Sequence, residues 1–178
     1  SVVDGGLKND RLVISKLVVG PSEDANGAYT PLTGTLMINS ALRDPVEVEK
    51  RREDATIYET IRGRPYTATD LALMRHPEDD PVKIVLKHEE GHIFMEKYNV
   101  IKNNAGDPSR ICTNDEWEKI IETEISRGLK PPTEYAQAST EEAFAEFRSL
   151  YRNGFVEKVP ESIRNYIDHV ENTVKGVA

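Results

Sequence analysis

The sequence predicts an α+β fold in which a small β-sheet near the N-terminus packs on a mainly helical core. Two runs rich in β-branched residues, 12–19 and 33–39, come early in the chain and predict strands. After them, capping residues and prolines precede a series of helix-forming stretches. The 178 residues can bury one core, so we expect a single domain over 1–178, with the strands in 1–75 and the helical core in 76–178.

The strands are read from residue type and from the turns that follow them. Residues 12–19 end at Gly20-Pro21, which predicts a strand and then a turn. Residues 21–31 are polar and include Asn26-Gly27, so we expect a loop with a turn there. We take residues 33–40 as the candidate exposed edge strand, to which an extended peptide could add.

Five helices are expected from their start and stop signals. Asp44-Pro45 supplies an N-cap and a proline at the first helical position, and that helix should end near Arg62, before Gly63. Asp80-Pro81 repeats the signal and should begin a helix that runs to about Tyr98. The other three are expected over residues 114–127, 140–152 and 160–175. The stretch 130–135 contains two prolines and is expected to be extended.

Composition narrows the classes of function. The net charge of −8 argues against nucleic acid and against an anionic membrane surface as partners. No apolar run approaches the roughly 18 residues that a transmembrane helix needs. The one cysteine, Cys112, excludes an internal disulfide and a cysteine-based zinc cluster, and we expect it to be a small buried residue. No signal peptide is visible, and the compartment and the oligomeric state are left open.

The chemistry is carried by His88-Glu89-Glu90-Gly91-His92, an H-E-x-x-H motif in the second expected helix. Residues four apart lie on one face of a helix, so His88 and His92 can present two imidazole nitrogens to one Zn²⁺. Glu89 lies beside them, where its carboxylate can deprotonate a water molecule. The alternative is a surface helix that carries these residues by chance. The remaining histidines are expected to be a solvated loop residue (His76) and a partly exposed helix residue (His169).

A hydrolytic zinc site needs a third protein ligand, and the helix over residues 140–152 offers carboxylates for it. Glu142 and Glu146 are four apart and share a face, so one can bind the metal while the other accepts the free ring N–H of a histidine ligand. The alanines between them are small enough to let this helix pack closely on another. Glu141 is a rival ligand that spacing does not exclude, and a capping role for Glu142 with Ser139 is a further alternative.

Residues 88–152 resemble the catalytic domain of anthrax toxin lethal factor and its relatives, among them the clostridial proline-proline endopeptidases. The resemblance rests on the H-E-x-x-H motif, on a tyrosine in an extended segment, and on the helix Glu142-Ala-Phe-Ala-Glu146-Phe-Arg148. In that family the tyrosine precedes the glutamate ligand by seven positions, as Tyr135 precedes Glu142. The resemblance implies that Glu142 is the third zinc ligand, that Glu146 orients a ligand histidine, and that Tyr135 is the catalytic tyrosine. The first 75 or so residues show no such match.

The resemblance further implies a zincin-like fold and a zinc-dependent endopeptidase of the gluzincin type, with one Zn²⁺ per chain. His88, His92 and Glu142 would hold the metal between the motif helix and the helix of Glu142. Glu89 would act as the general base, and Tyr135 would stabilise the developing oxyanion. The substrate would be a protein or peptide, with a leaning toward basic ones because the chain is acidic. We expect a secreted protein or a delivered, toxin-like effector, with a cytoplasmic location as the alternative.

Two other classes of protein compete with this interpretation. The repressor-cleaving zinc peptidases of phages and mobile elements also pair H-E-x-x-H with a glutamate-rich helix. Their glutamate usually follows much sooner than the 50 positions from His92 to Glu142, and they lack the tyrosine spacing. The second class is a non-catalytic interaction module, with or without a metal, which a missing base or ligand would indicate. Neither the base nor a ligand is missing here.

Overall fold

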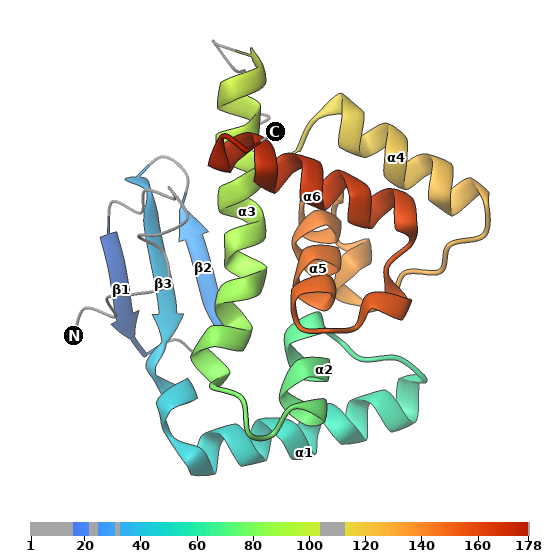
Figure 1. The fold of residues 1–178 in the computed structure, drawn as a ribbon. Helices are drawn as coiled ribbons and strands as arrows, with labels where there is room; N and C mark the ends of the chain where they lie inside the picture. Colours follow the sequence, from blue (N-terminus) through green and yellow to red (C-terminus); the bar gives the residue numbers. More distant parts are fainter. Residues whose placement is uncertain (1–15, 22–24, 31–32, 104–112, 178) are drawn as a thin grey trace.

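The long helix α3 (Pro81–Asn103) runs through the middle of the fold. The structure is a computed structural model, and it describes residues 16–21, 25–30, 33–103 and 113–177. Within these ranges it contains six α-helices and one three-stranded sheet. Figure 1 shows the sheet on one side of α3 and the C-terminal helices on the other. The expected combination of a small N-terminal sheet with a mainly helical remainder is confirmed.

The sheet has the strand order β1-β3-β2. β1 (Lys16–Gly20) pairs in parallel with β3 (Thr35–Asn39), and β2 (Gly27–Thr30) pairs with β3 in antiparallel fashion. The expectation that residues 33–40 form an exposed edge strand was therefore wrong, because β3 lies between the other two strands. Residues 12–15 of the first expected strand lie outside the described residues.

β2 itself was expected to be part of a polar loop, and this prediction was wrong. Its four residues, Gly-Ala-Tyr-Thr, show no apolar alternation, so the sequence carries no strand signal there. The rest of the fold accounts for the strand. Its backbone pairs with β3, and one of its faces is partly covered: Gly27 and Tyr29 are partly buried, whereas Ala28 and Thr30 are exposed. β2 is the edge strand that lies next to α3 (Figure 1).

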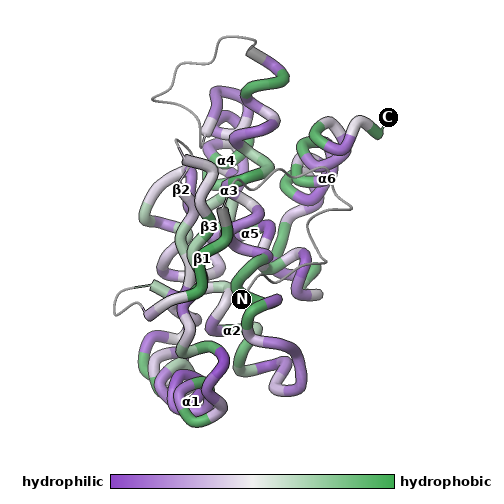
Figure 2. Tube along the Cα trace, turned by 90° about the vertical axis from the view of Figure 1, so that its left-hand side faces the viewer, coloured by the Kyte–Doolittle hydropathy of each residue, from purple (hydrophilic) through white to green (hydrophobic). Residues whose placement is uncertain are grey.

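α1 (Pro45–Arg62) begins and ends at the residues that the sequence predicted. The Asp44 side chain accepts a hydrogen bond from Val46 N at its start, and Gly63 ends the helix at φ 77°. Many residues of this helix are hydrophilic (Figure 2). A second helix, α2 (Ala68–Arg75), was not anticipated. Its signal was present in Thr67, whose side chain caps the helix by accepting from the backbone N–H of Asp70 at 3.0 Å.

The C-terminal helices were expected to within two residues: α4 (Asp115–Ser126), α5 (Thr140–Arg152) and α6 (Glu161–Lys175). Two predictions in this half need correction. α3 continues past Tyr98 to Asn103, and the residues between these two include no glycine or proline that would end the helix. Tyr135 begins a single 3₁₀ turn instead of lying in an extended segment, and within this turn the backbone N–H of Ala136 donates to the Thr133 hydroxyl at 3.1 Å.

The remaining sequence expectations concern residues away from the motif. His76 was expected to be solvated, but its Nε2 lies 2.9 Å from the Asn153 carbonyl oxygen, so it joins the end of α2 to the end of α5. His169, expected to be partly exposed, is exposed, and its Nε2 lies 3.2 Å from the Tyr98 hydroxyl. Cys112 lies outside the described residues. In the part of the chain that the structure describes, the helices all lack the length or the apolar character to cross a membrane.

Candidate metal centre

The candidate centre depends on the close approach of α3 and α5. A Cβ atom on Gly91 would lie 2.8 Å from Ala145 Cα and 3.2 Å from Ala145 Cβ, so the contact requires a glycine on α3 and a small residue on α5. This is the close packing expected from the alanines of that helix. Arg148 of α5 strengthens it by donating from Nη1 to the Lys87 carbonyl oxygen at 2.6 Å. The carboxylates of α5 can therefore reach the imidazoles of α3.

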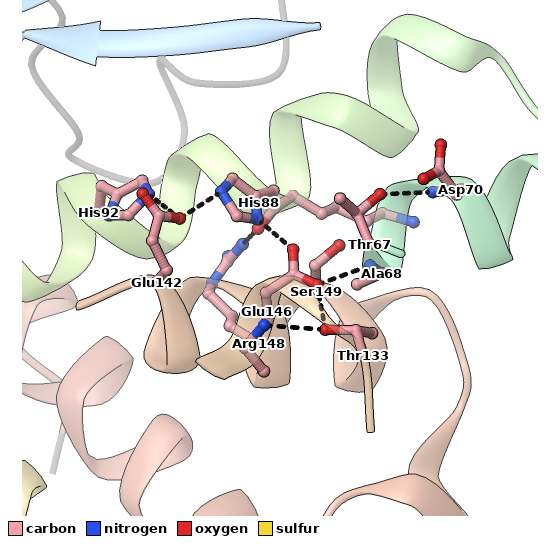
Figure 3. A network of polar contacts seen from close by, with 12 residues as sticks. Thr67, Ala68, Asp70, His88, His92, Thr133, Glu142, Glu146, Arg148 and Ser149 are labelled. Carbon is pink, nitrogen blue, oxygen red and sulfur yellow. Dashed lines mark hydrogen bonds and ion pairs between the residues drawn. The ribbon is translucent and has the colours of Figure 1, made fainter. Parts of the chain in front are cut away.

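Three side chains converge between these helices. The Nε2 atoms of His88 and His92 lie 3.2 and 3.3 Å from one carboxylate oxygen, Oε2 of Glu142 (Figure 3). Ligand atoms around a tetrahedral zinc with bonds of 2.0–2.1 Å are separated by about 3.3 Å, so the observed spacing suits such an ion. The Glu142 oxygen is buried and accepts no regular hydrogen bond from the described residues. The group of His88, His92 and Glu142 could hold a metal ion.

Glu146 orients one of the two imidazoles. Its Oε1 lies 2.9 Å from Nδ1 of His88, so this ring nitrogen carries a proton and faces Glu146 while Nε2 faces Glu142. Its other oxygen, Oε2, accepts from the backbone N–H of Ala68 and from the Thr133 hydroxyl, both at 2.7 Å (Figure 3). The sequence predicted Glu146 in this role. It gave no indication of Thr133, and Ala68 could have been inferred only from the capping sequence at the start of α2.

The charges of the group are strongly coupled. Burial by itself would lower the pKa of His88, but the carboxylates of Glu142 and Glu146, which face its two ring nitrogens, raise it to about 10. Burial by itself would raise the pKa of the Glu142 carboxyl, but its polar contacts with His88 and His92 prevail and hold that pKa well below the ordinary value. In this arrangement a proton balances the two carboxylates, and a cation between the same atoms could take that place.

Glu89, the expected general base, lies beside the metal group and outside it. Its side chain is buried and lines the same cleft, and burial raises the pKa of its carboxyl. On its other side it meets β2: a Cβ on Gly27 would lie 3.0 Å from both Cγ and Oε1 of Glu89. Glycine at this position therefore leaves the space that the Glu89 carboxylate occupies, a feature that sequence reasoning missed because the strand was not recognised.

Tyr135, the expected catalytic tyrosine, is held near the group by its backbone. Its N–H donates to the Tyr66 carbonyl oxygen at 2.9 Å, and its ring centroid lies 6.2 Å from that of His88. Burial and the negative charge of Glu142 raise the pKa of its hydroxyl to about 12. The hydroxyl therefore stays protonated near neutral pH and can donate a hydrogen bond.

These residues face a cleft of about 640 Å³. Residues 25–29, which include most of β2, line one part of it, and Tyr66 and the first turn of α2 line another. β2 is tied to α3 because the Tyr29 hydroxyl donates to the Glu96 carboxylate, one helical turn after His92. The rival ligand Glu141 also lines the cleft but does not belong to the metal group.

Replacing Glu146 with glutamine is expected to weaken zinc binding by about 10- to 100-fold, because a glutamine amide has one acceptor oxygen and cannot accept both from the His88 ring and from the Ala68 N–H and Thr133 hydroxyl. Competition with a chromophoric zinc chelator measures the affinity. Glu141→Gln serves as the matched control, since it removes the same charge from the same helix without touching a histidine. Equal affinities in the two variants would show that Glu146 does not orient the site.

The chain was also compared with known proteins. No family model matches it, and no curated protein and no solved structure matches it.

Proposed function

We propose that this chain is a zinc-dependent endopeptidase. The observation that carries the proposal is the group of His88, His92 and Glu142 with the buried carboxyl of Glu89 in the same cleft. Two histidines and one glutamate are the ligands of catalytic zinc in several peptidases, and they leave a fourth position open. The zincin-like fold and the relation to the lethal factor family remain predictions, supported by the same residues.

The proposed reaction divides the chemistry among these side chains. Bound zinc would lower the pKa of a coordinated water toward about 7 and polarise the peptide carbonyl. Glu89 accepts the proton of the attacking water and passes it to the leaving amine; its raised pKa makes it a stronger base than an exposed glutamate. The Tyr135 hydroxyl donates to the carbonyl oxygen as negative charge develops there. Glu146 holds the His88 ring in place.

A peptide substrate has a candidate strand to pair with. Within the described residues β2 pairs with β3 alone, and residues 25–29 line the cleft beside Glu89. An extended peptide could lie alongside β2 and pair with it through main-chain hydrogen bonds, which would bring its carbonyl groups past the metal group. This assigns the peptide-binding edge to β2 in place of residues 33–40.

The proposal is tested by metal-dependent cleavage of a peptide library. Protein stripped with a chelator is expected to be inactive, and about one equivalent of zinc is expected to restore cleavage that magnesium does not restore. Mass spectrometry of the library identifies the cleaved bonds. An intact library after incubation with fully zinc-loaded protein would overturn the proposal and favour a non-catalytic metal-binding module. Secretion or delivery into another cell remains a prediction.

A further inference from the structure

Most of the charged side chains that line the cleft are acidic. Its lining includes carboxyl groups from five residues: Asp70, Glu89, Glu141, Glu142 and Glu146. Among the described residues that line it, Arg51 is the only lysine or arginine. The proposed mechanism uses Glu89, the metal group and Glu146, and it leaves Arg51 without a role.

Arg51 is placed by the helix that carries it. Val48 and Ala55, three residues before it and four after it on α1, are the buried residues of that helix, so Arg51 lies beside its buried face. Its side chain is half-buried and reaches the cleft. The next residue, Arg52, donates to the carbonyl oxygens of Leu73 and Pro77 at 2.9 and 2.8 Å and joins α1 to the end of α2.

Arg51 differs from Arg52 because it has no comparable partner. It makes no hydrogen bond and no ion pair with any residue that the structure describes. Asp70, on the first turn of α2, lines the same cleft, and the positive charge of Arg51 acts to lower the pKa of its carboxyl, although the two groups form no ion pair within 4.0 Å. Burial raises the pKa of the Asp70 carboxyl, and its hydrogen bond from Thr67 acts in the opposite direction. Among the described residues none accepts a hydrogen bond from the Arg51 guanidinium, so this half-buried cation keeps its N–H donors for an acceptor in the cleft.

We infer that Arg51 binds a carboxylate of the peptide that occupies the cleft. This deepens the proposed function and rests on it. A guanidinium matches a carboxylate with two parallel N–H···O bonds, and this pairing is stronger when both groups are partly removed from water. The carboxylate comes either from an acidic side chain close to the scissile bond or from the free C-terminus of the substrate. The peptide group that contacts Arg51 would therefore be acidic, whereas the composition of the chain suggested a preference for basic peptides.

Matched peptides distinguish the two sources. Starting from a cleaved library sequence, glutamate and glutamine are compared at each position around the scissile bond, and a free C-terminal acid is compared with its amide. For the side-chain source, kcat/KM is expected to be about tenfold or more higher with glutamate at one position. For the C-terminal source, the same advantage belongs to the free acid. The absence of both preferences in the wild-type protein would overturn the inference.

Variants then assign the preference to Arg51. Arg51→Gln is expected to remove it, and Arg51→Lys is expected to keep part of it, since the charge remains but the planar fork is lost. Lys50→Gln is the matched control: Lys50 is an exposed neighbour on the same helix that does not line the cleft, and its loss changes the net charge equally. A preference that survives in Arg51→Gln, or that disappears equally in Lys50→Gln, would contradict the assignment.

A binding measurement separates this inference from the proposed function. N-acetylated pentapeptides carrying glutamate or glutamine, each with an acid or an amide C-terminus, are titrated into zinc-loaded wild type and Arg51→Gln by calorimetry, with circular dichroism as the check of folding. Tighter binding of the carboxylate forms by the wild type alone supports the subsite even if no peptide is cleaved. Equal binding of carboxylate and amide forms by the wild type overturns it.

Discussion

Replacing Glu89 with glutamine is expected to lower kcat by at least about 100-fold while zinc stays bound, because general-base catalysis contributes about 10²–10⁴ in rate. Glu89 is not a member of the metal group, so its removal leaves His88, His92 and Glu142 in place. Glutamine has the same shape as glutamate and fills the same space beside Gly27, so the comparison isolates the loss of a proton acceptor.

Two measurements are needed on the same Glu89→Gln sample: zinc content by elemental analysis and the rate of peptide cleavage. Glu90→Gln is the control within the motif, since Glu90 pairs with Arg148 at 3.1 Å and does not line the cleft. It is expected to keep most of the activity. Cleavage by Glu89→Gln at the wild-type rate, with zinc bound, would rule out the proposed role of Glu89.

Replacing Glu142 with alanine is expected to remove most of the bound zinc from a protein that otherwise carries about one ion per chain. Oε2 of Glu142 is the atom that approaches both imidazoles, at 3.2 and 3.3 Å, so its loss leaves only the two histidines as ligands. Apolar packing of α5 does not depend on this side chain, which lies at the cleft and not in the core. The variant should therefore stay folded, as circular dichroism would show.

The matched control for this second prediction is Glu141→Ala, which removes the neighbouring carboxylate. It is expected to keep its zinc, because Glu141 lies outside the metal group. Elemental analysis of both variants after dialysis decides between the two ligands. Full zinc in Glu142→Ala together with its loss in Glu141→Ala would move the third ligand to Glu141, and full zinc in both would point to Glu146.

The sequence alone determined the features that depend on local periodicity. Caps and prolines located α1, α3 and α5 because the residues that end a helix act on its own terminal turn. The spacing of four within H-E-x-x-H placed both histidines on one face of α3, and the same spacing placed Glu142 and Glu146 on one face of α5. The choice of Glu142 over Glu141 came from the resemblance, and the geometry of the metal group agrees with it.

Only the tertiary structure decided which distant segments complete the centre. Glu146 accepts a hydrogen bond from Ala68, which lies 78 positions away in the chain, and β2 forms because β3 and α3 provide its partners. Arg51 reaches the cleft from α1, on which the sequence indicated no site residue. Such contacts produce no periodic pattern in the sequence, because they depend on how helices and strands pack together and not on the spacing of neighbouring residues. The candidate ligands and Glu146 could therefore be predicted from local spacing and the resemblance, whereas the residues that hold Glu146 in place, and the walls of the cleft, could not.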